Sequence, residues 1–140
     1  MNTQKIKLEI FTLIRDEGLT IHGVASANKS PSASMPATQE LSPQRLLEDA
    51  KSVICYGVEI PKGILYAPSK NLSLYWRYCN MQYRTLDSIS NRLSSHLEQS
   101  GCLAAPIYSC FPWRVEHREF WGSLPLVYWA EQAGLGRLSK

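Results

Sequence analysis

The chain has 140 residues, 44% of them apolar, and a formal net charge of +3, which fits a single globular domain. Its lysines and arginines are scattered without a basic run, so neither nucleic acid nor an anionic membrane is expected as a partner. No apolar stretch approaches the roughly 20 residues of a membrane span. The N-terminus lacks an export signal, and the sequence therefore predicts a cytoplasmic protein.

The four cysteines lie far apart and form no Cys-x-x-Cys pair. In a reducing compartment, cysteines so distributed are expected as free thiols. Zinc and iron–sulfur sites usually contain at least one close pair of cysteines. The sequence therefore predicts no metal site within this chain.

The first elements are a helix and a strand. Residues 5–17 place Ile6, Ile10, Leu13 and Ile14 on one side of a helix that Gly18 ends. Residues 21–25 are β-prone and predict the first strand. Residues 26–42 are rich in serine, proline, alanine and threonine and predict a flexible loop. A loop of this length is often a lid or binding loop, although a surface loop without a function would have the same composition.

The next segments predict a short helix and a central strand. Ser42 caps residues 43–49, with Pro43 in the first turn. Residues 52–60 contain the apolar run 53–58, which is typical of a strand buried on both faces. Residues 64–70 then form a loop.

Residues 71–101 dominate the chain and predict one long helix, or two helices joined near Asn80. Gly101 provides its C-terminal cap. Its apolar residues recur at helical spacing: Tyr75, Tyr78, Leu86, Ile89, Leu93 and Leu97. The first half is unusually aromatic. It is either a core helix with aromatic residues at its rim or one wall of a cleft for a flat ligand.

The last third predicts a strand and a helix. Residues 102–109 read as a third strand, placed at an edge or bulge by Pro106. Residues 114–121 show neither helical nor strand periodicity. Ser123 is expected to cap a helix over residues 124–133, which Gly134 and Gly136 end. Because this glycine turn follows a helix, it cannot present N-terminal amides to a phosphate, and it reads as a C-terminal cap.

Acid–base chemistry has candidates in the same region. Glu116 and Glu119 flank His117 and could transfer protons if they were buried. An exposed polar turn accounts for these residues equally well. From residue chemistry alone, the sequence indicates an α/β domain with an aromatic-lined surface.

Three segments together carry a family resemblance. They are Leu-Glu-Asp-Ala-Lys-Ser-Val-Ile at 47–54 with Tyr56-Gly57; Tyr78-Cys79-Asn80 with Leu86-Asp87, the run 97–101 and Ala-Ala-Pro-Ile at 104–107; and Ala-Glu-Gln-Ala-Gly-Leu-Gly at 130–136. In this order they resemble the N-terminal corrinoid-binding region of epoxyqueuosine reductase, reductive dehalogenases and related iron–sulfur proteins. The resemblance covers about three quarters of the chain, and the Ala-Gly-Leu-Gly turn is its most specific part.

The resemblance implies a fold and a chemistry. The fold is a nitroreductase-like α/β (α+β) arrangement, here a partial and incomplete sheet flanked by helices, with residues 1–140 as the N-terminal part of a longer architecture. The cofactor is cobalamin, reduced by [4Fe–4S] clusters of a ferredoxin-type module or partner whose cysteines this chain lacks. We therefore expect a corrinoid-dependent reductase-like domain that is inactive alone.

The resemblance also assigns residues. Cofactor contacts are expected at Tyr75, Tyr78, Asn80, Tyr83, Gly134, Leu135 and Gly136. The family's proton-donating aspartate has no counterpart, and Glu119 is the nearest acid and our candidate for that role. Ser139-Lys140 replaces the family's Gly-Lys, and residues 26–42 lack the bulky residues of a substrate lid. Two alternatives stay open: a non-catalytic ligand-binding or homodimerising module, and a flavin-binding nitroreductase-like domain.

Overall fold

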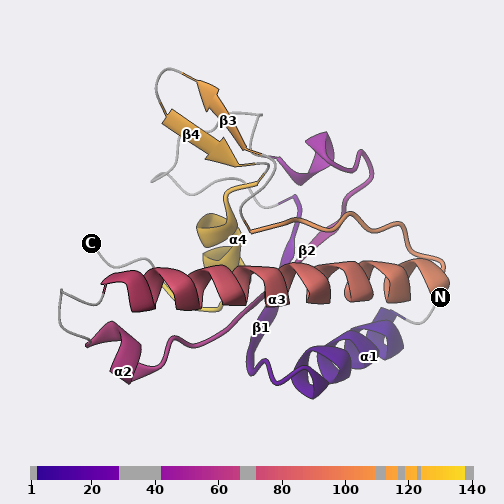
Figure 1. The fold of residues 1–140 in the computed structure, drawn as a ribbon. Coiled ribbons are helices and arrows are strands. Elements are labelled where there is room, and N and C mark those ends of the chain that lie inside the picture. The colour runs from indigo at the N-terminus through magenta and orange to yellow at the C-terminus, as the bar shows by residue number, and fades with distance from the viewer. Residues whose placement is uncertain are drawn as a thin grey trace.

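The computed structural model describes residues 3–28, 42–66, 72–109, 113–116, 119–122 and 124–137. Within these ranges the chain mixes helices with antiparallel strands, which agrees with an α+β class (Figure 1). The elements in chain order are α1 (Thr3–Asp16), β1 (Ile21–Ser26), the 3-10 turn η2 (Pro43–Arg45), β2 (Ser52–Gly57), α2 (Lys62–Leu65), α3 (Leu72–Gln99), β3 (Trp113–Glu116), β4 (Glu119–Gly122) and α4 (Leu126–Gln132). Most of the predicted loop 26–42, and Ser123, lie outside the described residues.

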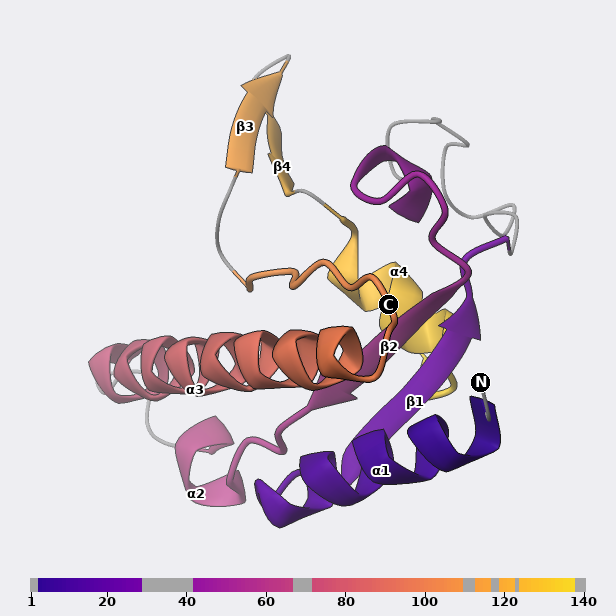
Figure 2. The ribbon, with the colours of Figure 1, turned by 90° about the vertical axis from the view of Figure 1, so that its right-hand side faces the viewer.

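The centre of the fold is a two-stranded antiparallel ribbon of β1 and β2. His22 lies opposite Tyr56, and Gly23 lies opposite Cys55. Directly opposed residues share a face of a ribbon, and successive residues alternate between faces. One face therefore carries His22 and Tyr56 and is covered by α1 and α3, while the other carries Gly23 and Cys55 and is covered by α4 (Figure 2).

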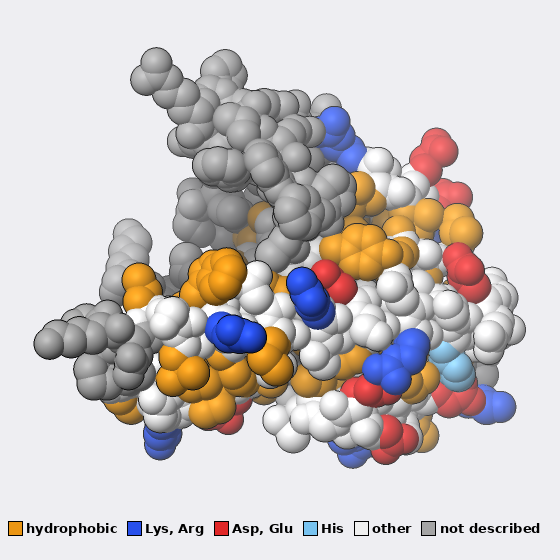
Figure 3. All heavy atoms as spheres, in the orientation of Figure 1, with side chains coloured by type: hydrophobic (Ala, Val, Ile, Leu, Met, Phe, Trp, Pro, Cys, Tyr) orange, Lys and Arg blue, Asp and Glu red, His pale blue; other side chains and the backbone are white. Residues whose placement is uncertain are grey.

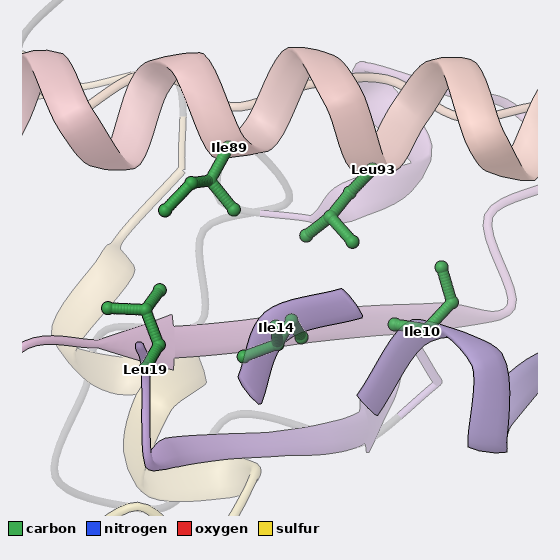
Figure 4. Packing of buried hydrophobic residues seen from close by; sticks show 5 residues of the cluster. All are labelled: Ile10, Ile14, Leu19, Ile89 and Leu93. Carbon is green, nitrogen blue, oxygen red and sulfur yellow. The ribbon is translucent and has the colours of Figure 1, made fainter. Parts of the chain in front are cut away.

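The first core lies between α1, α3 and the ribbon. Its buried residues come from α1, the turn after it, and the second half of α3: Ile10, Ile14, Leu19, Ile89 and Leu93 (Figure 4). The pairs 10/14 and 89/93 are each four residues apart, so each pair lies on one side of its helix. At the rim, the two terminal guanidinium nitrogens of Arg92 each lie 2.7 Å from one carboxylate oxygen of Glu17. This bidentate pair fixes the end of α1 against α3.

The second core lies on the opposite face of the ribbon. Ala25, Leu124, Tyr128 and Trp129 are buried there, packed against partly buried residues of β2 and of two later segments: Val53, Cys55, Ile107 and Ala133. The Tyr128 and Trp129 rings meet edge to face at 5.3 Å. The ribbon is thus covered on both faces although it has only two strands.

The long helical segment is one continuous helix, so the break considered near Asn80 is wrong. α3 runs unbroken from Leu72 to Gln99. The Asn80 side chain donates to the Trp76 carbonyl one turn back at 2.8 Å, which supports the helix where a break was considered. Gly101 follows with φ +82°, and Cys102 N–H donates to the Leu97 carbonyl, as expected of a glycine cap.

The predicted third strand, residues 102–109, is not a strand. The segment instead runs as a strap along α3. The Ser90 hydroxyl lies 3.4 Å from the Ile107 carbonyl, Tyr108 donates to Asn91 at 2.7 Å, and the Ser109 N–H donates to Asp87 at 2.8 Å. Side chains of α3 therefore reach two backbone groups of the strap, the Ile107 carbonyl and the Ser109 N–H, in place of a neighbouring strand.

Other boundaries also differ from the sequence expectation. β2 ends at Gly57, and although helices cover both of its faces, its residues 53–57 are half-buried because it pairs within the described residues with β1 alone. The helix expected over 43–49 is a single 3-10 turn, although Ser42 does cap it by accepting from the Gln44 N–H at 3.3 Å. Part of the predicted loop 64–70 belongs to α2, and residues 113–122 contain the β3–β4 pair. α4 begins after Pro125 rather than at Leu124.

No helix in the described parts of the chain is both long and apolar enough to cross a membrane.

Candidate functional site

The first half of α3 carries an exposed continuation of the core-facing side of the helix. Ile89 and Leu93 mark the core-facing side of α3. Toward the N-terminus of the helix, residues at spacings of three and four continue on this side: Leu86, Tyr83, Cys79, Tyr75 and Leu72. Leu72 is 72% exposed and Tyr75 and Tyr83 are each 40% exposed, with Trp76 beside them at 67%. We call these five residues, Leu72, Tyr75, Trp76, Cys79 and Tyr83, the aromatic stripe.

The polar chemistry of the stripe centres on Tyr75 and Cys79. A hydrogen bond with the Cys79 thiol one turn along raises the pKa of Tyr75 above its ordinary 10.0, and the charge of the Cys79 thiolate acts in the same direction. Tyr75 therefore stays a neutral phenol throughout the physiological range. A neutral, exposed ring suits contact with a flat apolar molecule.

Two other predicted contacts on α3 use their polar groups within the protein. The Tyr78 hydroxyl donates to the Glu59 carbonyl at 3.2 Å, which holds its ring toward the segment between β2 and α2. The Asn80 amide donates to the Trp76 carbonyl. Of the four α3 residues predicted to touch a cofactor, Tyr75 and Tyr83 thus lie on the aromatic stripe, whereas Tyr78 and Asn80 have structural hydrogen bonds.

The glycine turn lies on the other side of the ribbon. A side chain at Gly23 of β1 would overlap the Ala133 carbonyl oxygen and come within 2.9 Å of Leu135 Cδ1, so this turn packs directly on β1. Gly134 has φ +83°, and the Leu135 N–H donates to the Ala130 carbonyl at 3.0 Å. Figure 2 places α4 and the turn that follows it away from the first half of α3. The structure therefore does not bring Gly134, Leu135 and Gly136 together with the tyrosines.

The candidate proton donor lies in the β3–β4 pair. Glu119 is opposite Glu116 in the register, and His117 lies outside the described residues. The structure places only the backbone of Glu119, so its role stays a prediction. Within the described ranges, no group of three or more histidine, cysteine, aspartate or glutamate side chains is arranged to hold a metal ion.

Sequence reasoning missed several residues beside the tyrosines. Leu72 and Cys79 continue the same helical spacing, so the pattern could have revealed them. Leu65 and Tyr66, at the end of α2, are 53% and 80% exposed. Nothing in the local pattern distinguished that four-residue helix from a loop.

Cys55, on the α4 face of β2, provides a test of burial at the second core. Burial raises the pKa of Cys55 from 9.0 to about 11. Only the thiolate reacts with alkylating reagents, so at pH 8 Cys55 should react roughly a hundredfold more slowly in the folded protein than in the urea-unfolded chain. Iodoacetamide labelling with peptide mapping measures both rates, and equal rates would contradict this burial.

The same shift has a consequence for stability. The folded state disfavours the Cys55 thiolate. The contribution of the neutral thiol to the free energy of unfolding is therefore full below about pH 9, the pKa in the unfolded chain, and is lost as the pH rises toward about 11. We expect unfolding midpoints in urea to fall over that interval. A Cys55→Ser variant should show a smaller fall, because it has no thiol to ionise.

The comparisons with known proteins identify no family. No protein-family model, curated protein or solved structure matches the chain, and its function has to be inferred from the aromatic stripe and the residue pattern.

Proposed function

We propose that this chain is a corrinoid-binding module of a reductase, with a nitroreductase-like architecture, and that the aromatic stripe contacts the macrocycle. The residue pattern shared with the epoxyqueuosine reductase family supports the cofactor class. The observation that carries the proposal is the exposure of Leu72, Tyr75, Trp76 and Tyr83 on one side of α3. In the second half of the helix, this side packs in the first core. Exposed apolar side chains gathered on one side of a helix are typical of binding surfaces.

The residues of the stripe fit a corrin ring. A broad ring with apolar faces needs flat, uncharged contacts, and the rings of Tyr75, Trp76 and Tyr83 provide them. The bound corrinoid supplies the reducing chemistry through its cobalt. The chain's own residues bind the ring, orient it and exclude water from one of its faces. The glycine turn has a structural part in this proposal, since it packs on Gly23 rather than beside the stripe.

Electrons come from a ferredoxin-type iron–sulfur partner in this proposal, because the sequence contains no cysteine pattern for a cluster. Glu119 remains the candidate proton donor. The isolated chain is accordingly expected to bind the corrinoid and not to turn over substrate.

Titration with cob(II)alamin under anaerobic conditions tests the binding. The protein should shift the visible spectrum of the corrinoid, and Tyr75→Ala/Trp76→Ala should weaken binding by about tenfold or more, since two aromatic contacts are removed. Leu126→Ala/Val127→Ala is the matched control. It changes two residues of α4 that are 42% and 58% exposed, and should bind as the unaltered protein does.

Two outcomes would contradict the proposal. One is an unchanged corrinoid spectrum at high protein concentration. The other is equal binding by the stripe variant and the α4 control. A flavin spectrum in the purified protein would instead favour the flavin-binding alternative.

A homodimerising module is the second candidate, favoured by the strand pairing. Within the described residues β1 and β2 pair only with each other, so both outer edges of the ribbon can accept another strand. Sedimentation equilibrium over a concentration series distinguishes the two cases. A monomer at every concentration eliminates this candidate.

A further inference from the structure

A second exposed surface lies on a different side of α3. Leu74, Arg77, Met81 and Arg84 are three, four and three residues apart, so they form one line along the first half of the helix. Leu74 is 49% exposed and Met81 is 61% exposed, and both arginines are exposed. Their positions around the helix differ from those of Leu72, Tyr75 and Tyr83, so this line is separate from the aromatic stripe.

The short helix α2 lies beside this part of α3 and extends the surface (Figure 1). It adds the exposed Lys62 and Leu65. Figure 3 shows hydrophobic side chains gathered over α2 and the first half of α3 with lysine and arginine among them. We call these six residues, Lys62, Leu65, Leu74, Arg77, Met81 and Arg84, the cationic flank.

The stretch of sequence that forms the flank has charges of one sign. Between Pro61 and Leu86 the sequence contains Lys62, Lys70, Arg77 and Arg84 and no aspartate or glutamate. The ion pairs within the described residues lie on α1 and the second half of α3, and none includes a cation of the flank. Asp87, the next acid along the chain, accepts from the Ser109 N–H and hydroxyl. The six flank residues therefore include three cations and no carboxylate, while the exposed Glu59 lies just before α2 and Asp87 lies one turn after Arg84.

We propose that the cationic flank is a docking surface for an acidic protein segment with apolar side chains, such as an amphipathic helix with a glutamate-rich edge. Carboxylates of that segment pair with Arg77 and Arg84, and its apolar residues cover Leu74, Met81 and Leu65. The complementary charge selects the partner and speeds the encounter. Since the flank and the aromatic stripe are different sides of α3, this inference stands whether or not the stripe binds a corrinoid.

The composition of the flank favours a protein over the other anionic partners. Arginine and methionine are enriched at protein interfaces. A membrane-binding helix has a continuous apolar face with its cations on the opposite side, whereas here Arg77 and Arg84 alternate with Leu74 and Met81 on one line. Single-stranded nucleic acid is bound through several stacking aromatic side chains, whereas the six flank residues include none and the exposed Tyr66 lies at one end of the flank.

Fluorescence anisotropy with designed peptides tests the proposal on the full chain. The probe is a labelled amphipathic helix with glutamates beside a leucine face, and its counterpart carries lysines in place of the glutamates. The glutamate peptide should bind more tightly, and increasing salt should weaken it. Arg77→Glu/Arg84→Glu should lower its affinity about tenfold or more, because two attractions become repulsions.

The matched control, Lys51→Glu/Arg137→Glu, makes the same change of charge at two exposed residues away from α2 and α3 and should bind the glutamate peptide nearly as the unaltered protein does. Leu74→Ser/Met81→Ser is a second variant that keeps the charge and should also weaken binding.

Equal affinity for both peptides, or equal loss in the flank and control charge variants, would overturn the proposal. So would tighter binding to phosphatidylserine vesicles or to polyuridylate than to the glutamate peptide. Cobalamin binding by Arg77→Glu/Arg84→Glu should stay unchanged, which separates this test from that of the aromatic stripe.

Discussion

Ile14→Ala should lower the free energy of unfolding by about 3 to 4 kcal/mol. Ile14 is fully buried, 0% exposed, in the first core between α1, α3 and the ribbon (Figure 4). Truncation removes three methyl or methylene groups and leaves a cavity whose walls come from several elements, so the surroundings cannot collapse into it easily. Urea denaturation followed by far-UV circular dichroism measures the loss.

Leu8→Ala is the control for this substitution. Leu8 is on the same helix but is 63% exposed, so its truncation should change stability by no more than about 0.5 kcal/mol. Losses of similar size at Leu8 and Ile14 would contradict the orientation of α1 described here.

Gly23→Ala should destabilise the protein by about 3 kcal/mol or more, or displace the turn after α4. The added Cβ would overlap the Ala133 carbonyl oxygen, which belongs to the backbone and cannot move aside by a side-chain rotation. Relief requires the Ala133–Leu135 turn to leave β1, and Trp129 would lose its burial with it. Urea denaturation measures the stability, and near-UV circular dichroism reports the packing of the aromatic side chains, Trp129 among them.

Gly57→Ala is the matched control, because Gly57 lies in the partner strand and a Cβ there would meet nothing within 4 Å. Its effect on stability should stay within about 0.5 kcal/mol. If Gly23→Ala proves as mild as Gly57→Ala, the glycine turn does not pack on β1.

The sequence predicted the two longest described helices well, since their signals are local. The apolar spacing of Ile10 and Ile14 and of Ile89 and Leu93 located α1 and α3, and these residues form the first core. Gly18 and Gly101 were expected to end these helices, and both have positive φ. Each of these inferences needs only the helical period and the freedom of glycine to adopt a left-handed conformation.

The misassigned segments depend on distant partners. Residues 102–109 are apolar enough for a strand, but whether their backbone meets a strand or the polar side chains of α3 is decided by tertiary packing. The half-buried state of β2 likewise depends on how many strands pair beside it. β3 alternates apolar and polar residues over only four positions and β4 does not alternate, so neither strand was long or regular enough to be recognised.

The candidate site was predicted in part. The sequence identified an aromatic first half of the long helix, and the structure exposes Tyr75 and Tyr83 there. Whether these residues lie near the glycine turn depends on which face of the ribbon each element covers. The register of His22 with Tyr56 and of Gly23 with Cys55 decides this, and the sequence does not reveal that register.

The strap along α3 joins the two cores into one cooperative unit. Ile107 packs in the core beneath α4, while its carbonyl lies within hydrogen-bond distance of the Ser90 hydroxyl. Ser90 also shares a 2.5 Å hydrogen bond with the hydroxyl of Tyr56, whose ring packs in the other core. The Ser90 hydroxyl, which also reaches the Leu86 carbonyl at 3.1 Å, therefore contacts both cores, and loss of either core removes one of its partners. Such linkage favours all-or-none melting, with a single calorimetric peak, over stepwise loss of the two halves.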